Sequence, residues 1–272
     1  MYLPFWNLRE APFQNVADAR FAYLCAQHHE GLARLVYLAQ NRKLGGILTG
    51  PYGIGKSMVL ELLAQEVGKD NDSSYIGFDY VKGETLTLAR HVLAMMGFAE
   101  LVQTITTPFD AVSFLRQKRA NMKHTVLAID EAQAITDNDT FDFLQLLLNI
   151  SLVDRKMQPI SPAFTLILAG YIDAEHLMFQ KESLCQRLQI AWTLEPLNQQ
   201  QVVEYVQHRI RVAGGDIWLF DQEALDELAV AGGIPRMINN ICDVALMLGY
   251  AANVRQVNRS IMQQAVQEVL RR

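Results

Sequence analysis

A glycine-rich loop between an apolar run and an amphipathic helix constrains the fold of this chain more than any other feature. The loop Gly50-Pro51-Tyr52-Gly53-Ile54-Gly55-Lys56-Ser57 follows the apolar residues 46–49, and Val59, Leu62 and Leu63 form a helical stripe directly after it. A strand, a loop and a helix in this order are typical of phosphate-binding loops. An accidental glycine-rich turn would not require such a helix, so the pattern predicts that the chain binds a nucleoside triphosphate.

The residue types of this loop match the chemistry of a triphosphate. Successive backbone N–H groups must curl around the β-phosphate, and the glycines leave room for that approach. Lys56 can place its ammonium between the β- and γ-phosphates, and Ser57 can offer its hydroxyl to Mg²⁺. The following helix, Met58 to Val67, points its positive end at the anion. The loop residues predicted to bind ATP are Gly50, Pro51, Tyr52, Gly53, Ile54, Gly55, Lys56, Ser57 and Met58.

A second motif, Thr125 to Gln133, is an apolar strand that ends in two adjacent carboxylates. We predict that Asp130 holds Mg²⁺, usually through water, and that Glu131 orients and polarises the water that attacks the γ-phosphate. The alternative is a solvated acidic turn without catalytic function. The position of the pair at the carboxyl end of a strand favours the catalytic interpretation, because such folds bind ligands there.

Two arginines are candidates for contacts with the γ-phosphate. Arg236 opens a predicted helix after Gly232-Gly233-Ile234-Pro235, and it could swing over the nucleotide when two domains close. Arg187 lies just before the apolar run 188–194, where it could reach the nucleotide of a neighbouring subunit and stabilise the transition state. The alternatives are an ordinary surface arginine for Arg236 and a structural or interdomain salt bridge for Arg187.

From Ile47 onward, short apolar strands alternate with amphipathic helices, which is typical of a mainly parallel sheet covered by helices on both faces. The predicted strands are Ile47 to Thr49, Tyr75 to Phe78, Thr125 to Ile129 and Thr165 to Ala169. The predicted helices of this part are Gly31 to Asn41, Ser57 to Val67, Thr85 to Met96, Ala111 to Asn121, Thr140 to Ile150 and Leu177 to Phe179. The fold class is therefore α/β.

After Leu194-Glu195-Pro196-Leu197 the pattern changes to helices alone. We expect an α/β nucleotide-binding domain over residues 1–195, including an aromatic-rich start, and a small all-helical lid over residues 196–272. Asp221 is a plausible N-cap, and Pro235 suits a first helical turn. The predicted lid helices are Asn198 to Ala213, Gln222 to Ala231, Pro235 to Ala251 and Ser260 to Arg271.

Composition excludes several classes of protein. The chain has 272 residues, half of them hydrophobic, and no apolar run approaches the length of a membrane span. Arg9, Glu10 and Asp18 interrupt the region where a signal peptide would be apolar, so we expect a cytoplasmic protein without membrane insertion. Three cysteines and six histidines show no metal-ligand spacing. The net charge of -5 argues against a protein covered in positive charge. A local basic face could still bind nucleic acid.

The aromatic residues near the start, among them Trp6, Phe13 and Tyr23, resemble a stacking platform for single-stranded nucleic acid. We instead expect these rings to dock on the core and to form a wall of the adenine pocket.

Taken together, these motifs resemble the AAA+ ATPase superfamily, and almost the whole chain is similar to the general secretion pathway protein A (ExeA) family, including its pilus-associated MshM-like members. The matching residues are Met1-Tyr2-Leu3, Leu8, Pro12, Phe13, Arg20-Phe21, the stretch 28–35, the phosphate-binding loop, Asp130 to Gln133, Leu168-Ala169-Gly170, Gln186-Arg187-Leu188 and the stretch 232–239.

The resemblance implies an αβα nucleotide-binding domain, a helical lid, and a ring or filament with ATP sites shared between subunits. It implies the sensor 2 role for Arg236 and makes Arg187 the leading trans arginine finger. Tyr171 stands where relatives carry a glutamine, so the sensor 1 contact is expected to differ. ExeA-type proteins also continue beyond the position of Arg272 into a membrane span and a peptidoglycan-binding domain, so the wall-binding role is not transferred.

Three functions remain open at this point. The first is an ATP-hydrolysing assembly factor for a secretion, pilus or other envelope machine, with a protein partner in that machine. The second is an ATP-dependent regulator of transposition that binds duplex DNA, because the chain also resembles TniB- and TnsC-type ATPases. The third is a nucleotide-gated scaffold with little turnover, which the residue at position 171 suggests.

Overall fold

The computed structural model describes residues 2–171 and 182–271 of the chain. By their contacts these residues form two compact units. The α/β unit contains His28–Gly50 and Val59–Leu194, and the helical unit contains Met1–Gln27, Pro51–Met58 and Glu195–Arg272. The predicted helix at Leu177 to Phe179 lies outside the described residues.

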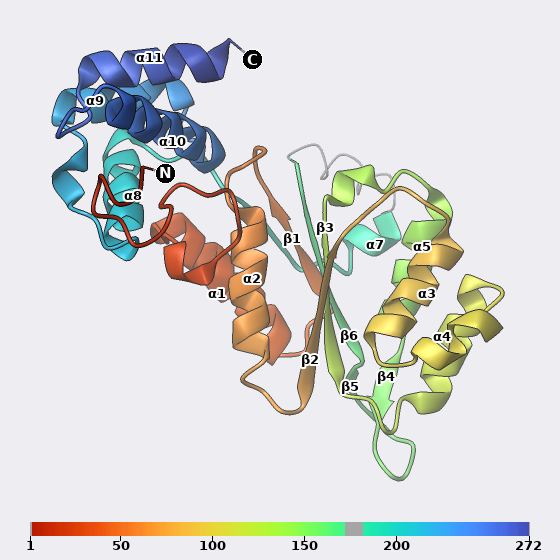
Figure 1. Cartoon of the computed structure of the whole chain (residues 1–272). Coiled ribbons are helices and arrows are strands. Elements are labelled where there is room, and N and C mark those ends of the chain that lie inside the picture. Colours follow the sequence, from red (N-terminus) through yellow and green to blue (C-terminus); the bar gives the residue numbers. More distant parts are fainter. Residues whose placement is uncertain (1, 172–181, 272) are drawn as a thin grey trace. The chain divides into compact units, whose positions relative to one another are not determined.

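A five-stranded parallel sheet forms the centre of the α/β unit, as predicted (Figure 1). Its strands, in spatial order, are β2 (Ser73–Asp79), β3 (His124–Asp130), β6 (Phe164–Gly170), β1 (Gly45–Thr49) and β7 (Ile190–Thr193). Every residue of β1, β3 and β6 is buried, whereas the edge strands β2 and β7 are partly exposed. This is the burial expected of parallel strands that are covered by helices on both faces.

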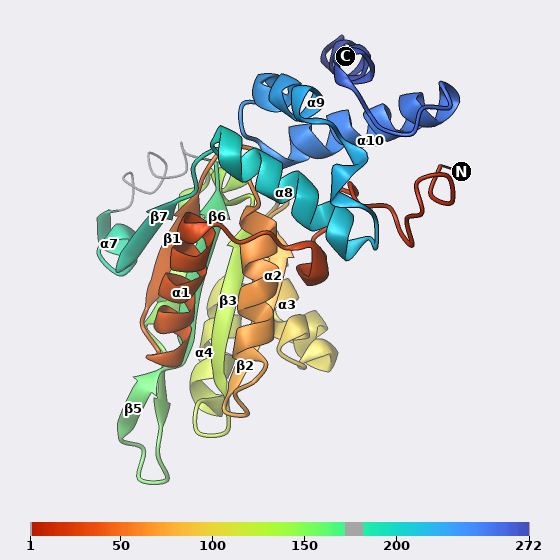
Figure 2. The same ribbon diagram turned by 90° about the vertical axis from the view of Figure 1, so that its left-hand side faces the viewer.

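Helices cover the two faces of this sheet. α1 and α2 lie on one face, towards the viewer in Figure 2, and α3, α4 and α5 lie on the other. The helices of this part are α1 (Ala26–Gln40), α2 (Lys56–Val67), α3 (Thr85–Met95), α4 (Pro108–Lys118), α5 (Asn138–Leu148) and the short α7 (Glu182–Cys185). Short 3₁₀ turns occur at Ala99–Thr104 and Ala132–Ala134.

Some elements differ from the sequence-based prediction for physical reasons. α4 begins at Pro108 rather than Ala111, because Thr107 and Asp110 form a reciprocal capping box ahead of it. The sequence analysis missed β7, a four-residue edge strand that pairs only with β1. It also missed the antiparallel hairpin of β4 (Ser151–Val153) and β5 (Pro159–Pro162), which lies at the end of the sheet where β6 begins (Figure 2). β5 begins and ends with proline, which is rare inside strands, so its sequence does not indicate a strand.

The C-terminal part is helical, as predicted. Between residues 194 and 271, all of which the structure describes, the only β-pairing is an isolated bridge between Phe220 and Val257. Asp221 caps α9 through the N–H of Ala224, and Pro235 is the first residue of α10. The helices are α8 (Gln199–Val212), α9 (Gln222–Glu227), α10 (Pro235–Ala251) and α11 (Arg259–Leu270), with 3₁₀ turns at Ile217–Leu219 and Leu228–Ala231.

The N-terminal segment packs on these C-terminal helices. The indole of Trp6 donates a hydrogen bond of 3.0 Å to the carbonyl of Leu246. The buried guanidinium of Arg209 donates to the carbonyls of Pro12 and Gln14 at 2.5 and 2.9 Å. The rings therefore dock on a core, as expected, but residues 2–27 group with the lid helices and not with the α/β domain to which the sequence assigns them.

His124, the first residue of β3, is fully buried in the α/β unit. Its Nδ1 lies 3.0 Å from the carbonyl oxygen of Pro162, and its Nε2 lies 3.0 Å from the hydroxyl of Thr165. Burial lowers the pKa of this imidazole below its ordinary value of 6.5, because the charged form would lose its hydration. The folded protein therefore disfavours protonation at this position.

This burial predicts a dependence of stability on pH. Below about pH 6.5 the unfolded chain binds a proton at His124 before the folded protein does, so the free energy of unfolding falls as the pH falls. Above that pH both states hold a neutral imidazole, and the free energy of unfolding no longer depends on the titration of His124. In His124→Gln the slope between about pH 7.5 and about pH 5.5 should be smaller by up to about 1.4 kcal/mol per pH unit in urea denaturation. The exposed His29→Gln variant is the control, and an unchanged slope in His124→Gln would contradict the prediction.

Candidate nucleotide-binding and hydrolysis site

The glycines of the predicted phosphate-binding loop have backbone conformations that other residues rarely adopt. Gly50, Gly53 and Gly55 have φ values of 153°, 76° and 114°. Glycine is the default residue at such positions, because it has no Cβ to clash with the neighbouring carbonyl oxygen. Ile54, between two of these glycines, is fully buried and anchors the loop. The loop therefore depends on glycine for its backbone path, as is expected of a loop whose N–H groups bind an anion.

Lys56 begins α2 at the end of this loop. Its residue surface is only 7% exposed, and its Nζ donates a hydrogen bond of 3.1 Å to the carbonyl oxygen of Pro51. The same ammonium lies 5.8 Å from the ring centroid of Tyr52. An ammonium removed from bulk water interacts strongly with an added anion, because the surroundings screen the charge less. The side chain predicted to bind the phosphates is thus held against its own loop.

Arg236, the predicted sensor 2 residue, contacts the phosphate-binding loop within the helical unit. Its backbone N–H donates a hydrogen bond of 3.2 Å to the carbonyl oxygen of Gly53. A Cβ added at Gly53 would lie 2.5 Å from the Cβ of Arg236 and 3.3 Å from its Cδ. The close approach of α10 to the loop therefore depends on glycine at position 53. Arg236 itself is exposed, and its role as a sensor of the nucleotide stays a prediction.

The two predicted carboxylates lie at the carboxyl end of β3. Asp130 is the last residue of the strand and is only 5% exposed, and its Oδ1 accepts a hydrogen bond of 2.8 Å from the backbone N–H of Glu131. Glu131 has a left-handed backbone, with φ 55° and ψ 35°. This conformation costs a non-glycine residue of order 1 kcal/mol and is found most often at functional sites.

The parallel sheet explains how two motifs far apart in sequence meet the same edge. β1 and β3 both pair with β6, so their carboxyl ends lie on one side of the sheet, and the phosphate-binding loop follows β1 directly. The neighbouring strand β2 brings Asp79 into register with Asp130. This third carboxylate at the edge was missed by the sequence analysis, and its position directly after an apolar strand is the signal that could have revealed it.

Tyr171, the residue expected to replace a polar sensor, is linked to Glu131 through another side chain. The backbone N–H of Tyr171 donates a hydrogen bond of 3.0 Å to Oε1 of Gln133, and the amide nitrogen of Gln133 donates to the carboxylate of Glu131. The sequence analysis named Gln133 only as part of a motif. No sequence signal shows this bridge, because the two strands that it connects are distant in the chain.

Arg187, the predicted trans arginine finger, forms hydrogen bonds with residues of its own α/β unit. Its guanidinium donates to the carbonyl oxygen of Ser183 at 2.5 Å and to the side chain of Asn149 at 3.2 Å. Both of these partners are uncharged, so the contacts are hydrogen bonds and not the salt bridge of the alternative interpretation. A role as a trans arginine finger stays a prediction.

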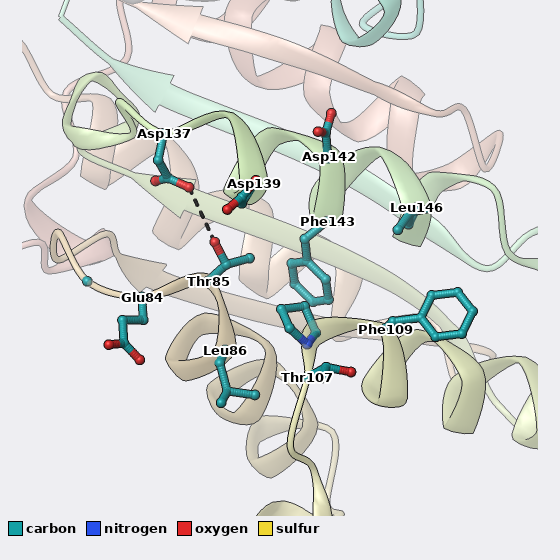
Figure 3. Close-up of a pocket in the computed structure, with 12 residues that line it drawn as sticks. Glu84, Thr85, Leu86, Thr107, Phe109, Asp137, Asp139, Asp142, Phe143 and Leu146 are labelled. Atoms are coloured by element: carbon teal, nitrogen blue, oxygen red, sulfur yellow. Dashed lines mark hydrogen bonds between the residues drawn. The ribbon is translucent and has the colours of Figure 1, made fainter.

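A pocket of about 590 Å³ occurs elsewhere in the α/β unit and contains none of the predicted site residues (Figure 3). It is bordered by the first turns of α3 and α4 and by α5. Asp137, one of its four acidic residues, caps α5 by accepting a 2.7 Å bond from the N–H of Thr140, and it also accepts a 3.3 Å bond from the hydroxyl of Thr85. Burial acts to raise the pKa of Asp137, but these hydrogen bonds hold it below its usual value. This carboxylate has a structural function.

The available ligands fit ATP with Mg²⁺ better than a metal held by protein alone. Among the described residues there is no group of three or more His, Cys, Asp or Glu side chains that could hold a metal ion. Mg²⁺ is usually bound by one or two protein oxygens together with substrate phosphates and water. The exposed Ser57 in the first turn of α2 and the buried Asp130 are oxygen ligands of the required kind.

The comparisons with known proteins agree with this geometry. The model of the AAA domain family matches residues 39–178, which is more than half of the chain. The chain therefore belongs to the AAA family of P-loop nucleoside-triphosphatases.

A particular relative extends the similarity beyond this domain. The general secretion pathway protein A of Aeromonas hydrophila is 30% identical over 99% of the chain. The chain spans 48% of the length of that relative. The sequence-based resemblance to this family is thereby confirmed.

Solved structures show the same fold at low sequence identity. The Aeropyrum pernix ORC2 protein, in ADPNP–ADP complexes, has a TM-score of 0.71 at 14% identity and covers 92% of this chain and 71% of its own. Drosophila ORC bound to DNA has a TM-score of 0.69 at 20% identity and covers 99% of this chain and 66% of its own. The Thermotoga maritima RuvB branch migration motor has a TM-score of 0.59 at 15% identity, with coverages of 89% and 68%.

The contact between Gly53 and Arg236 generates a prediction. In Gly53→Ala the new methyl group meets Arg236 in a backbone conformation that costs alanine about 1–2 kcal/mol, so we expect a lower melting temperature and at least about tenfold weaker ATP binding. Fluorescent-nucleotide titration and thermal unfolding measure the two effects. Gly97→Ala is the matched control, because Gly97 also has a positive φ, 90°, but no atom lies within 4 Å of its added Cβ. Equal nucleotide affinity in both variants would contradict the prediction.

Proposed function

We propose that this chain is a Mg²⁺-dependent ATPase that converts ATP to ADP and phosphate and oligomerises when it binds nucleotide. We further propose that it acts as an assembly factor or regulator for a secretion, pilus or other envelope machine. The observation that carries the proposal is the similarity to a general secretion pathway protein A over 99% of the chain. The loop and carboxylate geometry described above supports the enzymatic part.

In the proposed mechanism, one group of residues binds the nucleotide and the metal, and Glu131 activates the attacking water. The N–H groups of the loop and the Lys56 ammonium bind the phosphates, and Ser57 and Asp130 provide oxygens for the metal. Bound ATP with Mg²⁺ supplies the electrophilic γ-phosphorus and offsets the charge on the phosphate oxygens. Glu131 orients the attacking water and accepts its proton in hydrogen-bond reach.

The proposal for the remaining parts rests on the family. Arg236, seated on the phosphate-binding loop, senses the γ-phosphate, and Arg187 acts on the nucleotide of a neighbouring subunit once the chain assembles. No helix in the parts of the chain that the structure describes has both the length and the apolar character needed to cross a bilayer. A protein partner from the envelope machine, rather than lipid, is the proposed target of this motor.

Two variants separate binding from chemistry. Lys56→Ala removes the charge that contacts the phosphates, so nucleotide affinity should fall by roughly tenfold to a hundredfold. Glu131→Gln keeps the shape of the site and removes the base, so ATP should stay bound while turnover falls by about a hundredfold or more. A phosphate-release assay and nucleotide titration measure these effects, with the exposed Glu268→Gln of α11 as the control. Equal turnover in the wild-type and Glu131→Gln proteins would show that the assignment of the base is wrong.

The assembly part of the proposal predicts large species with ATP alone. Mass photometry of Glu131→Gln with ATP and Mg²⁺ should show oligomers that Lys56→Ala does not form, because Lys56→Ala cannot hold the nucleotide between subunits. The same measurement with duplex DNA tests the transposition alternative. If oligomers form only with DNA and dissociate as the salt concentration is raised, the protein is a DNA-bound regulator and the secretion proposal is wrong.

A further inference from the structure

The side chain of Gln133 connects two segments that carry candidate site residues. Its amide nitrogen donates to the carboxylate of Glu131, and its Oε1 accepts a 3.0 Å hydrogen bond from the backbone N–H of Tyr171, which follows β6. Glutamine suits this position because its amide has both a donor and an acceptor and carries no charge at any ordinary pH. An acidic or apolar side chain there could make at most one of the two contacts.

The backbone of Glu131 is constrained independently of this bridge. Its left-handed conformation directs the chain out of β3, and its N–H is bound to the carboxylate of Asp130 at 2.8 Å. The backbone contacts fix where the side chain of Glu131 begins, and the contact with Gln133 holds one of its carboxylate oxygens. The other carboxylate oxygen of Glu131 is the candidate acceptor of a proton from water. Both Glu131 and Gln133 are half-buried, so water competes with this hydrogen bond less than it would on the surface.

We propose that Gln133 is the positioning residue of the hydrolytic carboxylate, and that it couples Glu131 to the end of β6 in place of a polar side chain at position 171. This inference rests on the proposed ATPase function. Gln133 does not touch the reacting atoms. It acts by keeping the carboxylate of Glu131 in the orientation from which the attacking water is activated.

Substitution of Gln133 tests the inference. In Gln133→Leu both hydrogen bonds are lost, and in Gln133→Glu the contact with the Tyr171 N–H can persist while the donor to Glu131 is replaced by a repelling carboxylate. In both variants kcat for ATP should fall on the order of tenfold to a hundredfold, because a small displacement of a catalytic group costs this much. KM and the affinity for a fluorescent ATP analogue should stay within about twofold of wild type, since the binding loop is untouched.

A double-mutant cycle distinguishes positioning from a general loss of structure. On the Glu131→Gln background, Gln133→Leu should cause no further loss of turnover, because its effect passes through the carboxylate that is already missing. The matched control is Gln65→Leu. Gln65 donates a 3.4 Å hydrogen bond to Glu61 on the exposed side of α2, so the same pair of residue types is broken away from the site and kcat should not change.

The outcomes separate this inference from the proposed function. If the wild-type protein turns over ATP, and both Gln133 variants have the same kcat as wild type and bind the ATP analogue normally, the positioning role is overturned. The ATPase proposal would then remain intact. A fall in kcat that is equally large on the Glu131→Gln background would also overturn the positioning role. Absence of turnover in the wild-type protein would refute both proposals. If Gln133→Leu does not fold, as shown by thermal unfolding, Gln133→Glu decides the question.

Discussion

The burial of β1, β3 and β6 on both faces is the constraint on which the rest of the α/β unit depends. Strands with no exposed face carry apolar side chains almost throughout, so polar side chains are confined to their ends. Because the strands are parallel, their carboxyl ends lie together at one edge of the sheet. The phosphate-binding loop follows β1 at this edge, and Asp130 is the last residue of β3. The placement of the candidate site at this edge is thus a consequence of how the core is filled.

The helical unit depends on a different interaction, which is the pairing of one buried cation. Arg209 is only 4% exposed, and an unpaired charge in such a place would be costly. Its partners are the carbonyls of Pro12 and Gln14 and the hydroxyl of Tyr205. The N-terminal segment therefore completes the solvation of a charge on α8, and this gives the segment its position among the C-terminal helices.

The proposed hydrolytic carboxylate, Glu131, shows how a site acquires constraints that its motif does not reveal. The residue pair Asp130 and Glu131 indicates which oxygens are present, but the orientation of Glu131 depends on a left-handed backbone and on Gln133. Gln133 in turn accepts a hydrogen bond from the N–H of Tyr171, which directly follows the neighbouring strand β6. Glu131, Gln133 and the backbone of Tyr171 are thus linked in one hydrogen-bonded arrangement.

The sequence by itself determined the α/β class, the central strands and the loop, because apolar periodicity and glycine spacing are local properties that survive in a linear pattern. It also predicted α10 with both of its ends and the cap of α9. Only the tertiary structure decided that residues 2–27 join the helical unit, that the four-residue β7 adds to the sheet, and that Gly53 faces Arg236. These features arise from contacts between segments distant in the chain, and such contacts are set by shape and by the pairing of polar groups after the elements have formed.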